Sequence, residues 1–174
     1  MFKVELNQND LNKILNAVKG VSIRATIETM DTMQRKCSVT FAQLFKVNII
    51  SQKYATGWKY SKSYKDWKEK YYGQLNFWML SGDLYKAIHS SRYLNGYLGG
   101  VPMGAFDSGV KSWSRKDNRR LPIARYGWWL ELGNRNGTQP ARPILGPTIN
   151  EYMTSGDWIN KGIEALNKVK QQWT

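Results

Sequence analysis

The sequence predicts a fold of mixed class, with helices at both ends of the chain and short strands and turns between them. Apolar residues recur at three- and four-residue steps from about Ser22 to Ile50 with no Gly or Pro inside, which predicts one long helix. Gly, Asn and Pro residues punctuate 95–109 and predict short strands and turns. The apolar set of 155–173 repeats at helical spacing behind Asp157, a candidate N-cap, and predicts a C-terminal helix.

The first 50 residues form the predicted helical N-terminal part. A short helix capped by Asn9 or Asp10 is expected before the long one. The apolar stripe of the long helix includes Ile27 and Met30, and we interpret it as a core stripe rather than as a surface kept for a partner.

Length and composition set the next limits. A chain of 174 residues is expected to form one domain over 1–174, because this length can bury a sizeable core. Eight tryptophans and ten tyrosines exceed what such a core needs, so some of these rings are expected at contact surfaces. The formal net charge of +13 predicts an anionic partner, which could be nucleic acid, a membrane surface or an acidic protein face.

Two absences bear on the expected location. The single Cys37 excludes an internal disulfide and, on a helix, is expected to be a buried, unreactive thiol. The N-terminus lacks an apolar signal core, and no apolar run approaches the ~18 residues of a membrane span. We therefore expect a protein that works inside a cell, or in an assembly built there, without a membrane partner.

The middle of the chain holds two basic segments. In 53–79, six lysines alternate with Tyr and Trp, a pattern that can stack bases and hold phosphates. The favoured interpretation is an extension whose aromatic rings pack back on the domain under the lysine stems. The segment 111–122 lacks apolar periodicity and predicts an exposed loop that could contact an anionic partner. Its basic residues are Lys111, Arg115, Lys116, Arg119 and Arg120.

Few residues are suited to catalysis. His89 is the one histidine, and no nucleophile motif accompanies it. One His and one Cys cannot form an ordinary zinc site, so neither a metal nor another cofactor is expected. Glu131 lies in an aromatic, apolar turn between arginines. We interpret it as an ion-pair partner or a cap of local backbone rather than as a catalytic acid.

The stretch RYGWWLELGNRNGTQPARPILGP, residues 125–147, carries the most specific pattern. Tyr126 to Leu132 predicts a short apolar helical turn, rich in Trp and ended by Gly133. Pro140 and Pro143 fix φ on either side of Arg142 and hold it in a stiff, extended corner. Such a corner aims Arg142 in one direction and suits a contact that is repeated identically in a lattice or ring.

These residues resemble a known family, the phage virion morphogenesis proteins, which are tail-completion or neck proteins of tailed bacteriophages. One matching block is the small apolar turn with Tyr and Glu followed by Gly, a polar gap, and Ala-Arg-Pro with two apolar residues. The other block is a Gly-Trp pair, a Lys-containing stretch and Leu-Ser-Gly-x-Leu leading to an apolar strand. In this chain the second block is Gly57-Trp58, Lys68, Leu80-Ser81-Gly82-Asp83-Leu84 and Ile88. The two blocks span roughly half to two-thirds of the chain. The chain departs from the pattern at Trp128-Trp129, where smaller or less aromatic residues are expected.

The resemblance implies an α+β fold with N-terminal helices, a small antiparallel sheet in 80–150 and a C-terminal helix. It also implies a structural protein without enzymatic activity, located in the virion neck. Copies of it would form a ring, with a hexamer expected, between the head connector and the tail terminator or tail, around a channel for DNA. The residues expected at subunit or partner interfaces are Tyr126, Trp128, Trp129, Glu131, Arg142, Pro143, Ile144 and Leu145.

A second hypothesis comes from charge alone: the chain is a basic nucleic-acid-binding protein that uses 53–79 and 111–125. That function requires one contiguous basic face and binding that weakens strongly as salt rises. A ring subunit instead requires complementary patches on different sides of one molecule.

Overall fold

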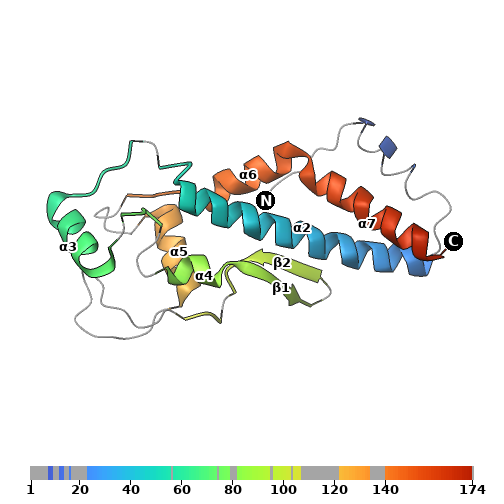
Figure 1. Ribbon diagram of the computed structural model, residues 1–174, viewed down its shortest axis with the longest axis horizontal. Helices are drawn as coiled ribbons and strands as arrows, with labels where there is room; N and C mark the ends of the chain where they lie inside the picture. The colour runs from blue at the N-terminus through green and yellow to red at the C-terminus, as the bar shows by residue number, and fades with distance from the viewer. Residues whose placement is uncertain are drawn as a thin grey trace. The chain divides into compact units, whose positions relative to one another are not determined.

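The computed structural model describes 8–9, 12–13, 16, 23–55, 57–73, 75–78, 82–94, 96–102, 104–106, 122–133 and 140–173. Within these residues the chain has an α+β fold that is mostly helical with one two-stranded antiparallel sheet, as expected. Its elements, drawn in Figure 1, are α2 (Ile23–Ser51), α3 (Lys62–Tyr72), α4 (Asp83–Ala87), β1 (His89–Tyr93), β2 (Gly96–Gly100), α5 (Ile123–Leu132), α6 (Leu145–Ser155) and α7 (Asp157–Trp173). The apolar residues of the short helix expected after Asn9 lie outside the described residues, as do residues 111–121 of the expected basic loop 111–122.

The two long helices confirm their sequence predictions closely. Helix α2 runs for 29 residues and α7 for 17. The predicted core stripe of α2 was wrong at its N-terminal end, because Ile27 and Met30 are exposed. The buried face of α2 instead carries several small or polar side chains that allow close packing. Its buried residues are Ala25, Thr29, Ser38, Ala42, Phe45, Asn48 and Ile49.

Helices α3 and α6 were not predicted. Helix α3 begins after Ser61, whose side chain accepts a hydrogen bond from the backbone N–H of Tyr64, and ends at Gly73 in the left-handed conformation. Among the described residues, no helix combines the length and the apolar character that a bilayer crossing requires.

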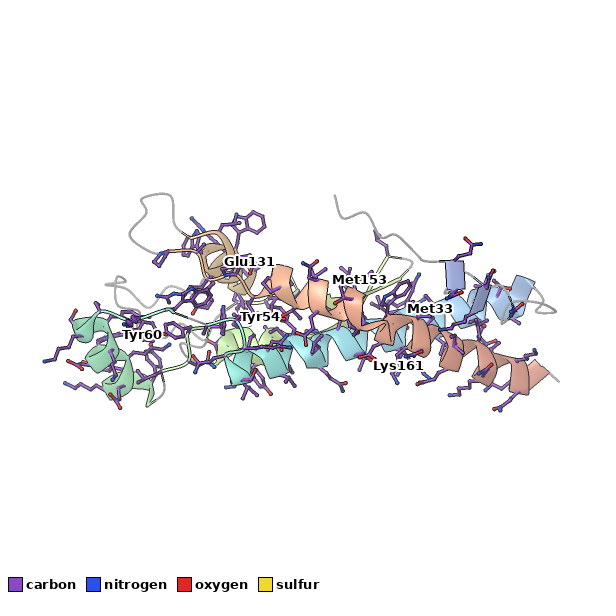
Figure 2. The ribbon with its side chains drawn as sticks, turned by 90° about the horizontal axis from the view of Figure 1, so that it is seen from above. Met33, Tyr54, Tyr60, Glu131, Met153 and Lys161 are labelled. Atoms are coloured by element: carbon purple, nitrogen blue, oxygen red, sulfur yellow. The ribbon has the colours of Figure 1, made fainter. Side chains whose placement is uncertain are left out.

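The chain divides into two compact units. The described part of the first unit comprises α2 as far as Phe41, the hairpin residues from Ser90 to Gly99, and the chain from Ile149 through α7. In it, Met33 on α2 lies against α7 (Figure 2), and a Cβ added at Gly162 would come within 2.9 Å of the Met33 sulfur. The hydroxyls of Ser38 and Ser90 share a hydrogen bond of 2.5 Å, which joins α2 to β1.

The second unit comprises Ala42 to His89 and Gly100 to Thr148. Helix α4 packs against α5 in this unit. A buried hydrogen bond of 3.1 Å, from the Asn48 side chain to the Thr148 hydroxyl, joins the last turns of α2 to the first turn of α6. The apolar core of this unit consists of Ala42, Phe45, Ile49, Trp78, Leu84, Ile88, Ile123, Leu130 and Ile144.

Candidate functional site

The Trp-rich turn forms the helix α5, which begins after Pro122 and ends at Gly133. Ile123 and Leu130 are buried on its inner side. The backbone N–H of Gly133 donates to the carbonyl of Trp129 at 2.9 Å, and the positive φ of Gly133 ends the helix. The sequence had predicted this short helical turn and its end.

The outer side of α5 is apolar and exposed. Trp128 is 63% exposed and Leu132 is 58% exposed, and residues four apart on a helix lie on one face. Arg125 lies one turn before them, with its guanidinium 4.9 Å from the centre of the Trp129 ring. We call Arg125, Trp128, Trp129 and Leu132 the α5 face.

Glu131 connects the end of α5 to the start of α6 (Figure 2). Its Oε2 accepts hydrogen bonds from the backbone N–H of Ile144 at 2.8 Å and of Leu145 at 2.9 Å. Its Oε1 accepts one from Gly146 at 2.8 Å. The carboxylate therefore caps the N-terminus of α6, where free N–H groups and the helix dipole favour a negative charge. A Cβ at position 146 would lie 3.3 Å from Oε1, so Gly146 leaves room for this cap.

The Ala-Arg-Pro corner joins the core through Arg142. The backbone N–H of Arg142 donates to the Leu130 carbonyl at 2.6 Å, and its carbonyl accepts from the indole N–H of the buried Trp78 at 2.9 Å. Pro143 is exposed, Ile144 is buried, and Leu145 is 37% exposed. The corner thus presents Pro143 and Leu145 to solvent, while Ile144 packs in the second unit.

The Arg142 side chain lies against aromatic rings of its own subunit. Its guanidinium carbon is 5.2 Å from the centre of the Tyr60 ring and 5.3 Å from that of Phe77. Lys68 approaches the same Tyr60 ring from α3, with Nζ 5.0 Å from its centre. We call Tyr60, Lys68, Asn76, Phe77 and Arg142 the aromatic–cation cluster.

Lys68 is the unusual member of this cluster, because its side chain is only 1% exposed. Its Nζ donates to the Tyr60 hydroxyl at 2.8 Å and to the Asn76 carbonyl. Burial, and secondly the positive charge of Arg142, lower the pKa of Lys68 to about 7. Near neutral pH this amine therefore exists in both its charged and its neutral form.

The tyrosines around the cluster keep their protons. Burial raises the pKa of Tyr60 and of Tyr64, and the Arg142 charge opposes this rise in both. Burial also raises the pKa of Tyr126, and the neighbouring Tyr64 and Tyr60 raise it further. Tyr126, expected at an interface, is thus electrostatically coupled to the cluster.

The structure does not describe the remaining residues that were expected to contact an anionic partner. The five cations of the 111–122 loop lie outside the described residues. His89 is exposed, and its Nδ1 lies 2.8 Å from the Ala87 carbonyl. Within the part of the chain that the structure describes, no group of three His, Cys, Asp or Glu residues could hold a metal ion.

The buried role of Lys68 was not predicted from the sequence, where this residue appears only within a motif of the resembled family. A usable signal was present: Lys68 is four residues after Tyr64 and four before Tyr72, so the helical period puts it on the aromatic side of α3. The capping of α6 by Glu131 agrees with the backbone-cap interpretation of that acid, although the capped groups lie 13 to 15 residues away.

Comparison with protein-family models, curated proteins and solved structures finds no match to this chain.

Proposed function

We propose that this chain is a structural protein of the phage head–tail neck, in which copies form a ring that completes the tail and joins it to the head connector. The two sequence blocks that resemble the phage virion morphogenesis proteins are the origin of this proposal. The observation that supports it best is the α5 face, an exposed apolar surface on a firmly held helix.

The composition of the α5 face suits a protein contact. Trp and Arg are the residues that most often dominate binding energy at interfaces, and this face carries both, beside Leu132. Burying an exposed side chain the size of Leu132 stabilises a complex by about 1.5–3 kcal/mol before the costs of association. Trp128 offers a larger ring at little cost in conformational entropy.

The support beneath the α5 face is rigid. Glu131 fixes the end of α5 to the start of α6 through three backbone hydrogen bonds, and Leu130 anchors the inner side in the core. A contact made identically in every subunit of a ring requires such a fixed geometry. The Ala-Arg-Pro corner is attached to α5 by the hydrogen bond of 2.6 Å from the Arg142 backbone N–H to the Leu130 carbonyl, so the corner and the α5 face can serve one interface.

The high net charge of each copy favours contacts between copies that are apolar. Each copy carries a formal net charge of +13, so copies repel one another at low salt. Salt screens that repulsion and leaves apolar burial in place, so ring formation should strengthen as salt rises. Binding to DNA should weaken under the same change.

Matched surface variants test the α5 face. We expect Trp128→Ala and Leu132→Ser each to reduce the oligomer fraction in sedimentation velocity. Ile50→Ser is the control, because Ile50 is 57% exposed on α2 of the same unit but outside the α5 face. Equal effects of all three substitutions, with the fold retained, would remove the support that α5 gives to this function.

One observation favours the alternative function, a basic nucleic-acid-binding protein. The exposed side of α3 and the residues before it carry Lys59, Lys62, Lys65 and Lys70, which could contact phosphates without reading sequence. Asp66 and Glu69 are exposed on the same helix and interrupt this surface. Fluorescence anisotropy with a short DNA duplex at two salt concentrations, using Lys62→Gln and Lys65→Gln, measures this activity directly.

A further inference from the structure

The aromatic–cation cluster brings two basic side chains together without an acid. Lys68 and Arg142 both contact Tyr60: the Lys68 Nζ lies 2.8 Å from its hydroxyl, and the Arg142 guanidinium carbon lies 5.2 Å from the centre of its ring. No carboxylate of the described residues pairs with either of them. Two cations against one ring therefore share a site that has no balancing negative charge in this part of the chain.

The hydrogen bonds of the two cations are also incomplete. The charged form of Lys68 has three N–H donors, and its Nζ contacts two acceptors, the Tyr60 hydroxyl and the Asn76 carbonyl. The Nε of Arg142 is buried and has no hydrogen-bond partner among the described residues. Unpaired donors on buried cations are costly, and native proteins usually satisfy them.

The electrostatics of Lys68 reflect this imbalance. Burial and the Arg142 charge lower the pKa of Lys68 to about 7, so part of the site is discharged near neutral pH. An anion placed beside both groups would offset the positive charge of Arg142, which lowers the pKa of Lys68, and would therefore favour the charged form of the amine. Anion binding and protonation of Lys68 are then linked.

We propose that Lys68 and Arg142 form a binding site for a small oxyanion, with phosphate and sulfate as its representative ligands, and that Lys68 takes up a proton when the anion binds. The guanidinium of Arg142 lies beside the stacked rings of Tyr60 and Phe77, 5.2 Å and 5.3 Å from their centres, and its planar fork can donate to two oxygens of one anion. Arg142 is only half-buried, which leaves a route from solvent. This site is independent of the ring function proposed above.

The chemistry of the site requires an acceptor with several oxygens, and either a phosphate group or a carboxylate supplies it. Comparing the binding of sulfate and of acetate distinguishes a phosphate-type ligand from a carboxylate ligand, because sulfate is a tetrahedral dianion and acetate is a planar monoanion. Sulfate also keeps its charge throughout the pH range in which Lys68 titrates, so any proton uptake belongs to the protein.

Isothermal titration calorimetry of the whole chain with sulfate, in two buffers of different ionisation enthalpy near pH 8, measures affinity and proton uptake together. We expect binding with uptake of up to one proton, and affinity that falls as pH rises above the pKa of Lys68. Lys68→Met and Arg142→Gln should each weaken sulfate binding by about tenfold or more. Lys86→Met should bind as the unaltered chain does, because Lys86 is exposed on α4, outside the cluster and outside the lysines of α3.

The proposal is overturned by any of three results: no sulfate binding, binding without proton uptake, or unchanged binding in Lys68→Met. Loss of folding does not obscure the test, because replacing a buried amine with an apolar side chain of similar length is expected to preserve the fold. Acetate binding of similar strength would assign the site to a carboxylate ligand, and sulfate binding alone would assign it to a phosphate-type ligand. Both results support the site.

Discussion

The carboxylate of Glu131 lies 2.8 Å from the backbone nitrogen of Gly146, across the turn between two helices. With Ile144 and Leu145 also donating to Glu131, one side chain satisfies three N–H groups that the start of α6 would otherwise leave unpaired. Helix α5, which carries the exposed Trp128, is thereby attached to the helix that follows the Ala-Arg-Pro corner.

Replacing Glu131 with Gln should destabilise the fold by about 1–2 kcal/mol, because the amide keeps one acceptor oxygen but loses the second oxygen and the charge. Urea unfolding followed by tryptophan fluorescence measures the change. Glu69→Gln, at an exposed acid of α3, should change stability by less than about 0.5 kcal/mol. Equal stability of the two variants would show that the cap contributes nothing.

Replacing Lys68 with Met should leave stability unchanged or raise it by about 1–4 kcal/mol near neutral pH, because the buried amine loses hydration when it is charged. Thermal unfolding in a buffer without oxyanions measures this effect. Marked destabilisation would mean that the hydrogen bonds to Tyr60 and Asn76 outweigh the cost of burial.

The pH dependence of stability follows from the same residue. The folded pKa of Lys68, about 7, lies below its ordinary value of 10.5, so the unfolded chain holds more protons between these values. Stability should therefore rise with pH from about 7 toward 10. Above about pH 10 it should fall, because the raised pKa values of Tyr60 and Tyr126 keep protons on the folded chain that the unfolded chain has lost. In Lys68→Met the rise should disappear, whereas the fall should remain.

Replacing Arg142 with Ala should destabilise the subunit by about 1–3 kcal/mol, through loss of the contacts with the Tyr60 and Phe77 rings and of the packing of its stem. Arg125→Ala is the control, because Arg125 lies exposed over a single ring, that of Trp129. Chemical unfolding of both variants shows whether Arg142 stabilises its own subunit. A stable Arg142→Ala subunit that no longer assembles would instead place Arg142 at an interface.

The long helices could be predicted from sequence because their signals are local. The apolar periodicity of α7 reflects its own residues alone, although Asp157, the expected N-cap, is the first residue of the helix and not its cap. The start of α6 could not be predicted, because the group that caps it, Glu131, belongs to another helix. Helix α3 was not predicted, because its inner side consists of aromatic rings and Lys68. In the sequence these residues alternate with other lysines, which indicates a basic segment rather than an apolar stripe.

The candidate site, like the helices, could be predicted only where its features depend on neighbouring residues in the sequence. Two prolines beside Arg142 indicated a stiff corner, yet stiffness does not determine which way a side chain points. The direction comes from Tyr60 and Phe77, which lie more than 60 residues earlier in the sequence. The expected interface role of Arg142 stays a prediction. Trp128 is exposed on α5, where a partner could reach it.

The most direct test of the proposed neck function is the native mass of the purified chain at low and high salt, with and without a short DNA duplex. We expect a discrete oligomer near six copies that strengthens with salt, does not require DNA and is lost in Trp128→Ala. A monomer at both salt concentrations that shifts only when DNA is added, and releases the DNA as salt rises, would contradict it and favour the nucleic-acid-binding alternative.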